Sequence, residues 1–246
     1  MQKTLYFDIE TTDITLAINT YQLKNRISYF NPDSIVRDWS ILGAAWAFDD
    51  EPPESTTVNP KSVFNDEKVV KKLHSALSEA EVLIGHNSDN FDIKKFNTRA
   101  IKYGLAPISQ KVTIDTLKMA RKYFKFTSNK LSYIADFLEV DAKEASPDWE
   151  LIKQGDADEL KYMQEYNEQD VIVTREVYKK LRSFHHTHPN TSQEIRDVNG
   201  EIVRSCKKCS STNIRRDGTR LLNSGRRRQQ WRCRDCKGAS IYDFVK

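Results

Sequence analysis

The sequence predicts an α/β fold, a mixed five-stranded sheet flanked by helices, followed by a small C-terminal module held together by a metal. Three observations predict it. Three strand-like segments come first and an alternation of helices and strands follows, which is the order expected of a mixed sheet. Hydrophobic residues make up 38% of the 246 residues, enough for one packed core. All four cysteines fall within the last 41 residues.

Three consecutive strands are expected at the start of the chain. The segments 4–10 (TLYFDIE), 40–48 (SILGAAWAF) and 56–59 (TTVN) are rich in apolar, aromatic and β-branched residues. The turn-forming sequence DDEPPES joins the last two. Sequential strands of this kind pair most simply as an antiparallel meander. The segment 14–39, between the first two strands, is interpreted as an insertion without recognisable chemistry.

Helices and further strands are expected to alternate from residue 65 onward. Apolar residues at helical spacing behind acidic residues predict a helix over 65–80. Strands are predicted at 81–87 and 111–114, and helices at 92–103, 116–124, 130–139 and 158–183. The polar, proline-containing segment 140–156 is expected to be a connection.

Charge and composition limit the classes of function. No stretch approaches the ~18 consecutive apolar residues of a membrane helix, and the N-terminus lacks the pattern of a signal peptide. We therefore expect a cytoplasmic protein, monomeric and not bound to membranes. Residues 186–246 carry 14 Lys and Arg against 6 Asp and Glu, a net charge of +8, which leaves −4 for residues 1–185. This asymmetry indicates a polyanion partner for the tail and bound cations for the body, or else a solvated surface.

Two carboxylates interrupt the first strand. Asp8 and Glu10 are two positions apart in LYFDIETTD, so they project from the same face at the end of the strand. Two carboxylates this close repel each other, and each is costly to bury without a partner. A divalent cation bound between them removes both costs.

Two later segments add further carboxylates. Asp92 in IGHNSDNFD follows a predicted strand and opens a predicted helix. It caps this helix or, if Asn90 is the cap, faces the end of the sheet. Tyr166 and Asp170 are four residues apart in a strongly helical segment, so they lie one turn apart on one face. That face also carries the apolar residues expected to pack on the core, where a carboxylate is conspicuous.

The segments FDIETT, HNSDNFD and YNEQD occur in this order within residues 1–184. They resemble the three exonuclease motifs of the DnaQ-like (DEDD) 3′–5′ exonuclease superfamily, and are similar to motifs in the proofreading domains of family B DNA polymerases. Tyr166, preceded by Glu165 rather than by histidine, places the resemblance with the tyrosine (DEDDy) subgroup. The resemblance implies a ribonuclease H-like fold for residues 1–184.

The resemblance also implies two Mg²⁺ or Mn²⁺ ions held by four carboxylates, a ligand set that suits these hard cations better than zinc. Asp8 would bridge both ions, Glu10 and Asp170 would complete the site on the side of the nucleophile, and Asp92 would hold the second ion. Tyr166 is a poor base at neutral pH because the pKa of a tyrosine is about 10. We expect it to orient the attacking water.

Other polar residues near the motifs are candidates for smaller roles. Substrate contacts are expected from Thr11, Thr12, Asn87 and Lys130, and further phosphate contacts from Lys95 and Arg99. A turn role is an equal expectation for the two threonines, and a loop amide for Asn87. His74 and His86 are expected to be structural, and Asp115 to cap the helix that follows it.

The four cysteines form two pairs, Cys206-x2-Cys209 and Cys233-x2-Cys236, separated by 23 residues. This spacing is typical of one structural zinc ion held by four thiolates. Disulfides are not expected in an intracellular chain, and a redox pair would not need a duplicate. The segment 204–246 resembles the zinc ribbons of some transposases and nucleic-acid enzymes, and 185–203 is predicted to be a linker.

The ribbon also carries residues suited to nucleic acid. Arg226, Arg227 and Arg228 can neutralise phosphates, and Trp231 can stack on a base. The alternatives are docking of a protein partner and a solvated surface.

These patterns together predict a two-metal-ion 3′–5′ exonuclease that releases nucleoside monophosphates from DNA, single strands favoured, with a zinc ribbon that aids binding. An exoribonuclease acting on RNA stays open, because the sequence does not show which sugar is read. A non-catalytic nucleic-acid-binding or adaptor protein is the alternative from another class. The presence of all four acidic residues and the tyrosine favours the enzyme.

Overall fold

The computed structural model describes residues 3–17, 30–140, 145–186, 188–190 and 195–241. Parts of the predicted insertion, connection and linker, and the last residues of the predicted ribbon, lie outside the described residues. All of the candidate site residues lie within them.

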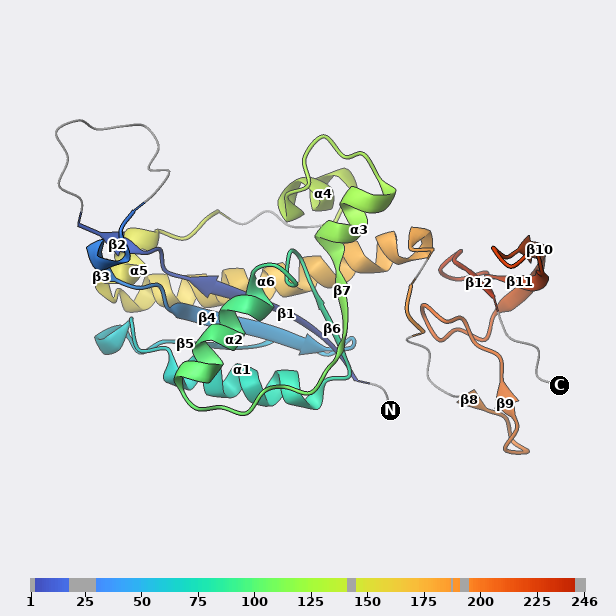
Figure 1. Ribbon diagram of the computed structural model, residues 1–246, viewed down its shortest axis with the longest axis horizontal. Helices are drawn as coiled ribbons and strands as arrows, with labels where there is room; N and C mark the ends of the chain where they lie inside the picture. The colour runs from blue at the N-terminus through green and yellow to red at the C-terminus, as the bar shows by residue number, and fades with distance from the viewer. Residues whose placement is uncertain (1–2, 18–29, 141–144, 187, 191–194, 242–246) are drawn as a thin grey trace.

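The main sheet has five strands. They are β1 (Thr4–Thr11), β4 (Ile41–Phe48), β5 (Glu54–Thr57), β6 (Val82–Gly85) and β7 (Val112–Asp115). Their order across the sheet is β5-β4-β1-β6-β7 (Figure 1). β4 is antiparallel to both β1 and β5, whereas β6 is parallel to both β1 and β7. The predicted mixed sheet and its antiparallel meander are confirmed, with β5 two residues earlier than expected.

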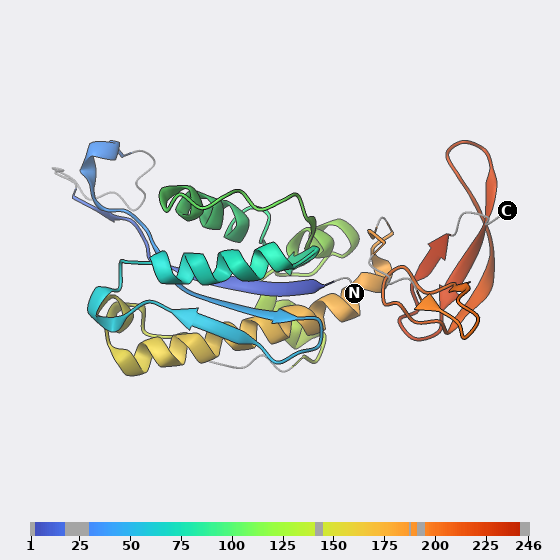
Figure 2. The same cartoon turned by 90° about the horizontal axis from the view of Figure 1, so that it is seen from below.

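Helices cover both faces of this sheet (Figure 2). They are α1 (Glu67–Glu79), α2 (Asp92–Lys102), α3 (Thr116–Tyr123), α4 (Leu131–Phe137), α5 (Trp149–Gln154) and α6 (Ala157–Leu181). α1 and α2 pack on the face of β1 that carries Leu5, Phe7 and Ile9. α3, α4 and most of α6 pack on the opposite face, which carries Tyr6. By strand alternation Asp8 and Glu10 belong to this second face, beneath α6.

A glycine lets α6 approach the sheet where the carboxylates lie. Gly43 of β4 is directly opposite Glu10 in the register of β1 and β4. A Cβ atom at Gly43 would lie only 2.9 Å from Cε of Met163 on α6. A side chain there would displace the end of the Met163 side chain, which packs over this position.

The helix α5 was not predicted, since its residues fall in the expected connection. Asp148 caps it by accepting hydrogen bonds from the amides of Glu150 and Leu151, and it ends at Gly155, where φ is 86°. An aspartate N-cap and a glycine with positive φ at the C-terminus are both sequence signals for the ends of a helix. The helix was missed because its 6 residues are too few for an apolar periodicity to be visible.

Two short antiparallel pairs were also not predicted. β2 (Thr15–Leu16) pairs with β3 (Ile35–Arg37) inside the insertion, and β8 (Ile195–Arg196) with β9 (Ile202–Val203) inside the predicted linker. Short 3₁₀ helices occur at Pro32–Ser34 (η1), Pro60–Ser62 (η2) and Arg182–Phe184 (η3). Strands of two residues leave almost no pattern in a sequence, which explains why they escaped prediction.

The C-terminal tail forms a second antiparallel sheet from β10 (Ile214–Leu221), β11 (Arg227–Cys233) and β12 (Ala239–Ile241). Figure 2 shows this sheet beyond the C-terminal end of α6, and it shares no strand with the main sheet. None of the helices in the described part of the chain has the length and apolar character needed to span a bilayer.

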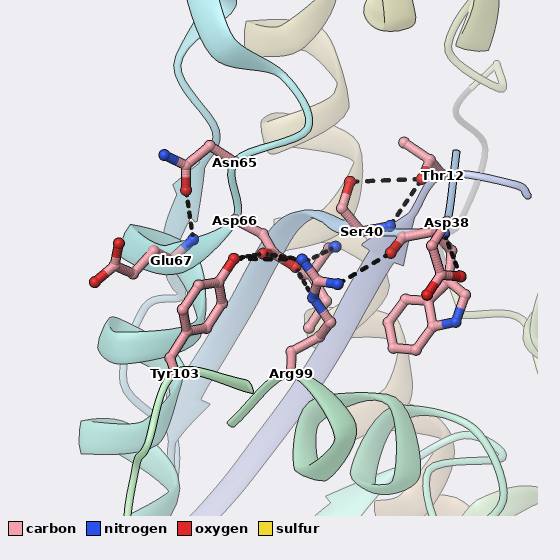
Figure 3. Close-up of polar contacts among 10 residues, drawn as sticks. Thr12, Asp38, Ser40, Asn65, Asp66, Glu67, Arg99 and Tyr103 are labelled. Atoms are coloured by element: carbon pink, nitrogen blue, oxygen red, sulfur yellow. Dashed lines mark hydrogen bonds and ion pairs between the residues drawn. The ribbon is translucent and has the colours of Figure 1, made fainter. Parts of the chain in front are cut away.

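A buried ion pair joins α1 to α2 on the first face of the sheet. The guanidinium of Arg99 donates hydrogen bonds of 2.5 Å to both carboxylate oxygens of Asp66, and both residues are buried. The Tyr103 hydroxyl and the Ile41 amide donate to the same carboxylate (Figure 3). Burial raises the pKa of Asp66, but these hydrogen bonds outweigh it and hold the pKa below its ordinary value. Arg99 thus stabilises the core through this ion pair, and its buried guanidinium is not placed to contact a phosphate.

We expect Asp66→Ala to destabilise the protein by about 3–5 kcal/mol, because it leaves the Arg99 charge buried without its partner. The double variant Asp66→Ala/Arg99→Met should recover part of this loss. Glu67→Ala is the matched control, since Glu67 pairs with Lys71 at the surface and should contribute less than about 1 kcal/mol. Urea denaturation followed by tryptophan fluorescence measures all three. Equal losses for Asp66→Ala and Glu67→Ala would contradict this assignment.

Candidate active site

Three carboxylates meet between β1 and α6. Asp8, Glu10 and Asp170 each offer an oxygen atom, and these atoms all lie within 4.8 Å of one another. All three side chains are partly buried. Asp8 and Glu10 share one face of β1, and Asp170 comes from the helix that packs on that face. The structure therefore brings together three of the four carboxylates that the sequence singled out.

The fourth carboxylate approaches the same strand from α2. Asp92 is 2% exposed, and its Oδ1 accepts a hydrogen bond of 3.1 Å from the amide of Ile9, between Asp8 and Glu10. Asp92 is the first residue of α2, and Phe91 occupies the cap position without a side-chain hydrogen bond. The oxygen of Asn90 accepts instead from Lys94. Asn90 is therefore not the cap, but Asp92 faces the end of the sheet, as the second sequence alternative expected.

The carboxylates suppress one another's ionisation. Burial, followed by the negative charges of Asp92, Glu10 and Asp170, raises the pKa of Asp8 well above its ordinary value. Burial and the charges of Asp170 and Asp92 raise the pKa of Glu10 to about 8. Burial raises the pKa of Asp92 to about 7, although the amide of Ile9 partly offsets it. Such mutual repulsion among buried carboxylates is what bound cations relieve.

We expect the melting temperature without divalent metals to fall as the pH rises. A carboxyl whose folded pKa lies above its unfolded value stabilises the fold fully below about pH 4, and this stabilisation is lost as the pH rises through the folded pKa. This loss of stability therefore continues up to about pH 8, the folded pKa of Glu10. Between about pH 5 and pH 8 the fall should be roughly 5–10 °C.

Differential scanning fluorimetry measures this fall, and added Mg²⁺ or Mn²⁺ should reverse most of it at high pH. The control is the variant Glu10→Gln/Asp92→Asn, which removes two of the titrating groups and should flatten the pH dependence. A melting temperature that rises with pH in metal-free wild type would contradict the repulsion described above.

One residue of the site was missed by sequence reasoning. Asn167, 1% exposed, donates a hydrogen bond of 2.7 Å from Nδ2 to Oδ2 of Asp8. It lies three positions before Asp170, so both face the sheet from adjacent turns of α6. Tyr166 is partly buried and lies one turn before Asp170, as the spacing predicts. Its spacing of three residues from Asp170 on one helix could have identified Asn167 from the sequence.

The two threonines after the carboxylates have different surroundings. Thr12 is buried, and its Oγ1 accepts a hydrogen bond of 2.9 Å from the amide of Ser40, so it joins the end of β1 to the start of β4. Thr11 is partly buried, and its Oγ1 accepts a hydrogen bond of 3.1 Å from Lys95. Thr12 thus links two strands and is not part of a turn, whereas Thr11 lies beside a cation.

Asn87 and Lys130 lie on neighbouring loops. Asn87 has a φ of 68°, and its amide donates a hydrogen bond of 3.0 Å to Asp115. Its carbonyl accepts from the amide of Phe91, which shapes the turn into α2. Lys130 is exposed at the start of α4, and the carbonyl of Asn129 next to it contacts His86 at 3.0 Å.

The remaining sequence expectations concerned structural roles, and these are confirmed. Asp115 caps α3 by accepting hydrogen bonds from the amides of Leu117 and Lys118. His86 lies 2.9 Å from Oγ1 of Thr116, and His74 lies 2.8 Å from the carbonyl of Ala106.

A cavity of about 490 Å³ opens beside Glu10. The aromatic residues Phe91 and Trp149 form part of its lining. The other lining residues besides Glu10 are Thr11, Thr12, Asp13, Leu42, Glu150 and Lys153. Phe91 is 38% exposed. Trp149 and Lys153 belong to α5, so the unpredicted helix supplies one wall of this cavity.

The four cysteines gather in the tail with their sulfur atoms within 4.8 Å of one another. Sγ of Cys206 lies 3.6 Å from that of Cys236, and Sγ of Cys209 lies 3.7 Å from that of Cys233. Four sulfurs at ~2.3 Å from a tetrahedral zinc would be about 3.8 Å apart, so this spacing fits a zinc ion and excludes disulfides in these positions.

The candidate nucleic-acid-binding residues of the tail lie on the β10–β11 hairpin. Trp231 is partly buried, and the guanidinium groups of Arg204 and Arg216 lie 5.3 and 5.7 Å from its ring centroid. Arg226 and Arg227 are exposed next to the hairpin turn, and Arg228 is partly buried.

Comparisons with known proteins agree with this architecture. A curated protein, the PolC-type DNA polymerase III of Ureaplasma parvum serovar 3, is 25% identical over 194 residues, which are 72% of this chain and 13% of that protein. A solved structure, the family B DNA polymerase of the hyperthermophilic archaeon Pyrobaculum calidifontis, matches with a TM-score of 0.56 at 16% identity. That match covers 74% of this chain and 24% of the polymerase chain. The chain thus spans a small part of each relative, and the second likeness is one of fold.

A family match covers more than half of the chain. The RNase H superfamily matches residues 38–182, a segment that contains Asp92 and Asp170 and begins after β1. The mixed sheet with helices on both faces is the ribonuclease H-like fold that the sequence predicted. The chain therefore belongs to the RNase H superfamily.

Proposed function

We propose that this protein is a metal-dependent 3′–5′ exonuclease that releases nucleoside monophosphates from DNA, single strands favoured. The observation that carries the proposal is the meeting of Asp8, Glu10 and Asp170 at one partly buried point of an RNase H fold, with Asp92 of α2 bonded to the same strand. The two relatives are both DNA polymerases by name, which supports a nucleic-acid substrate and favours DNA.

Two Mg²⁺ or Mn²⁺ ions fit this site. The ligand atoms are carboxylate oxygens, the hard donors that these ions prefer, and cations would relieve the repulsion that raises the pKa of Asp8. We assign Asp8 to both ions, Glu10 and Asp170 to the first, and Asp92 to the second. When bound, the ions would activate the attacking water and neutralise the charge that develops on the phosphate.

The protein's own side chains orient the reacting groups. Asn167 fixes Asp8 through its 2.7 Å hydrogen bond. We assign to Tyr166, one turn before Asp170, the orientation of the attacking water. The Lys95 ammonium lies 4.2 Å from the centroid of Trp39 and bonds Thr11, which supports a contact between Lys95 and the substrate phosphate.

The cavity beside Glu10 is suited to the terminal nucleotide. Phe91 and Trp149 offer aromatic rings on which a base can stack. Thr11 lies between this cavity and Lys95, where it can contact the sugar. We add Asn87 and Lys130 as contacts from the adjoining loops.

The tail completes the proposal. We assign residues 1–184 to the nuclease domain, 185–203 to a connecting segment and 204–246 to a ribbon built on one zinc ion. Arg226, Arg227, Arg228 and Trp231 would add affinity for nucleic acid, an assignment supported by their place on one exposed hairpin.

A nuclease assay tests the function. Single- and double-stranded DNA and RNA, labelled at the 5′ end, are incubated with Mg²⁺, Mn²⁺ or EDTA. We expect single-stranded DNA to shorten one nucleotide at a time with either metal and to stay intact in EDTA. A circular single strand is the matched control, because it has no 3′ end and should survive. Cleavage of the circle would indicate an endonuclease, faster loss of RNA an exoribonuclease, and no turnover of any substrate would overturn the proposal.

A further inference from the structure

A second cavity, of about 510 Å³, lies where the end of α6 meets the tail. Phe184 and His186, which follow α6, line one wall. Arg220, Arg232 and Lys237 of the tail line the other. Figures 1 and 2 both show the tail sheet next to this end of α6. We call this cavity the junction cleft.

A buried lysine fixes the two walls of the junction cleft to each other. Lys208 is 5% exposed, and its Nζ donates a hydrogen bond of 2.8 Å to the carbonyl of Ser183, the residue before Phe184. That carbonyl lies at the C-terminal end of a helix, where partial negative charge favours a cation. A Cβ atom at Gly238 would lie 2.9 Å from Cδ of Lys208, so the lysine stem is closely packed inside the tail.

The charge of the junction cleft is positive. Arg220, Arg232 and Lys237 line it, and among the residues that the structure describes no carboxylate lines it. Arg232 is held by Asp217, at 2.8 Å, and by the carbonyl of Lys237, so its charge is partly neutralised and its position fixed. Arg220 is exposed, and within the described part of the chain Lys237 donates to the carbonyl of Arg234. The charges of Arg220 and Lys237 therefore remain available to an anion.

An exposed aromatic ring stands beside these charges. Phe184 is 56% exposed, and its ring meets Phe124 edge to face at a centroid distance of 5.2 Å. Phe124 stacks on Phe126 at 5.3 Å, and Phe126 contacts Phe137. Because the other rings already restrict the side chain of Phe184, little conformational entropy is lost when a base stacks on it. Aromatic rings next to cations are the features with which proteins bind single-stranded nucleic acid.

We propose that the junction cleft binds single-stranded polynucleotide, with a base stacked on Phe184 and phosphates paired with Arg220 and Lys237. The cleft is distinct from the carboxylate site, since Leu181 at the end of α6 lies about 16 Å along the helix axis from Asp170. The cleft would hold nucleotides on the 5′ side of the one at the carboxylates. This last role rests on the proposed exonuclease function, whereas the binding itself does not.

The test is binding of fluorescent oligo-dT and oligo-rU of about 20 nucleotides to the full-length protein, without added divalent metals, over a range of salt concentrations. We expect Phe184→Ala to weaken binding by about fivefold to 100-fold, the loss of one stacked base. Arg220→Glu/Lys237→Glu should weaken it at least as much. It should also lower the slope of log affinity against log salt by about 1.4, because two phosphate contacts are lost.

The matched controls are Ile101→Ala, an exposed apolar residue of α2, and Lys68→Glu/Lys72→Glu, which makes the same charge change on α1. Both should bind like wild type. The proposal would be overturned if the cleft variants bind with the affinity and salt slope of wild type while they retain its zinc content and melting temperature. Normal binding by a wild type that degrades no substrate would refute the exonuclease function and leave the junction cleft standing. A difference between the dT and rU arms would identify which of the two oligonucleotides the cleft prefers.

Discussion

Asp8→Asn and Asp170→Asn will each lower the nuclease rate by at least about a thousandfold while leaving the protein folded. Each change keeps the size and shape of the side chain but removes a negative charge from the point where three carboxylates meet. Loss of a metal ligand forfeits several kcal/mol of transition-state stabilisation, and about 4 kcal/mol corresponds to this factor. Initial rates on 5′-labelled single-stranded DNA, at saturating Mg²⁺ and at saturating Mn²⁺, measure the effect.

The same variants should be more stable than wild type when no divalent metal is present. Asp170→Asn removes a charge that raises the pKa of both Asp8 and Glu10. Asp8→Asn removes the carboxyl whose own pKa is raised by burial and by these charges, so ionising the remaining carboxylates costs the fold less. Lower activity combined with higher stability would show that the variants have lost catalysis and not their fold. Asp158→Asn is the matched control, because Asp158 is an exposed aspartate on the first turn of α6 and should keep wild-type activity. Full activity in Asp8→Asn would remove the carboxylates from the proposed mechanism.

The carboxylates could be found from the sequence because each has a local signal. Asp8 and Glu10 interrupt one apolar strand, and Asp170 shares a helical face with residues that pack on the core. Strand alternation and helical periodicity fix the direction of such side chains before the tertiary fold is known. The same periodicities placed the five strands and the longer helices, which is why the fold class was predicted correctly.

The residues that escaped prediction act through contacts between distant segments. Asn167 matters because it bonds Asp8, which is 159 positions earlier in the chain. Arg99 was predicted to contact a phosphate. The tertiary fold instead buries its guanidinium in an ion pair with Asp66, which lies 33 positions earlier in the chain. Trp149 lines the cavity beside Glu10 from a helix too short to show a periodicity. No local pattern carries this information, since burial and pairing are decided by the tertiary fold.

Cys206→Ser will remove zinc from the protein and unfold the tail without unfolding the main sheet. The described residues of the tail bury few apolar side chains, Cys206 and Cys233 among them, so the sheet β10-β11-β12 has little core of its own. In metal-bound modules of this size, the free energy of zinc binding is about 10–16 kcal/mol and supplies the folding energy. We expect the zinc content to fall from one ion per chain to none, and the tail amides to lose their protection against hydrogen exchange.

The hydrophobic clusters around the main sheet contain none of the described residues of the tail, so the thermal transition of the nuclease part should stay close to that of wild type. Ser224→Ala, in the exposed turn between β10 and β11, is the matched control and should keep both zinc and protection. Chelation then separates the two metal sites. After EDTA treatment, Mg²⁺ alone should restore the carboxylate site, whereas the tail should refold only with Zn²⁺, because thiolates select the softer ion. A Cys206→Ser protein that retains one zinc ion and a protected tail would refute the four-cysteine site.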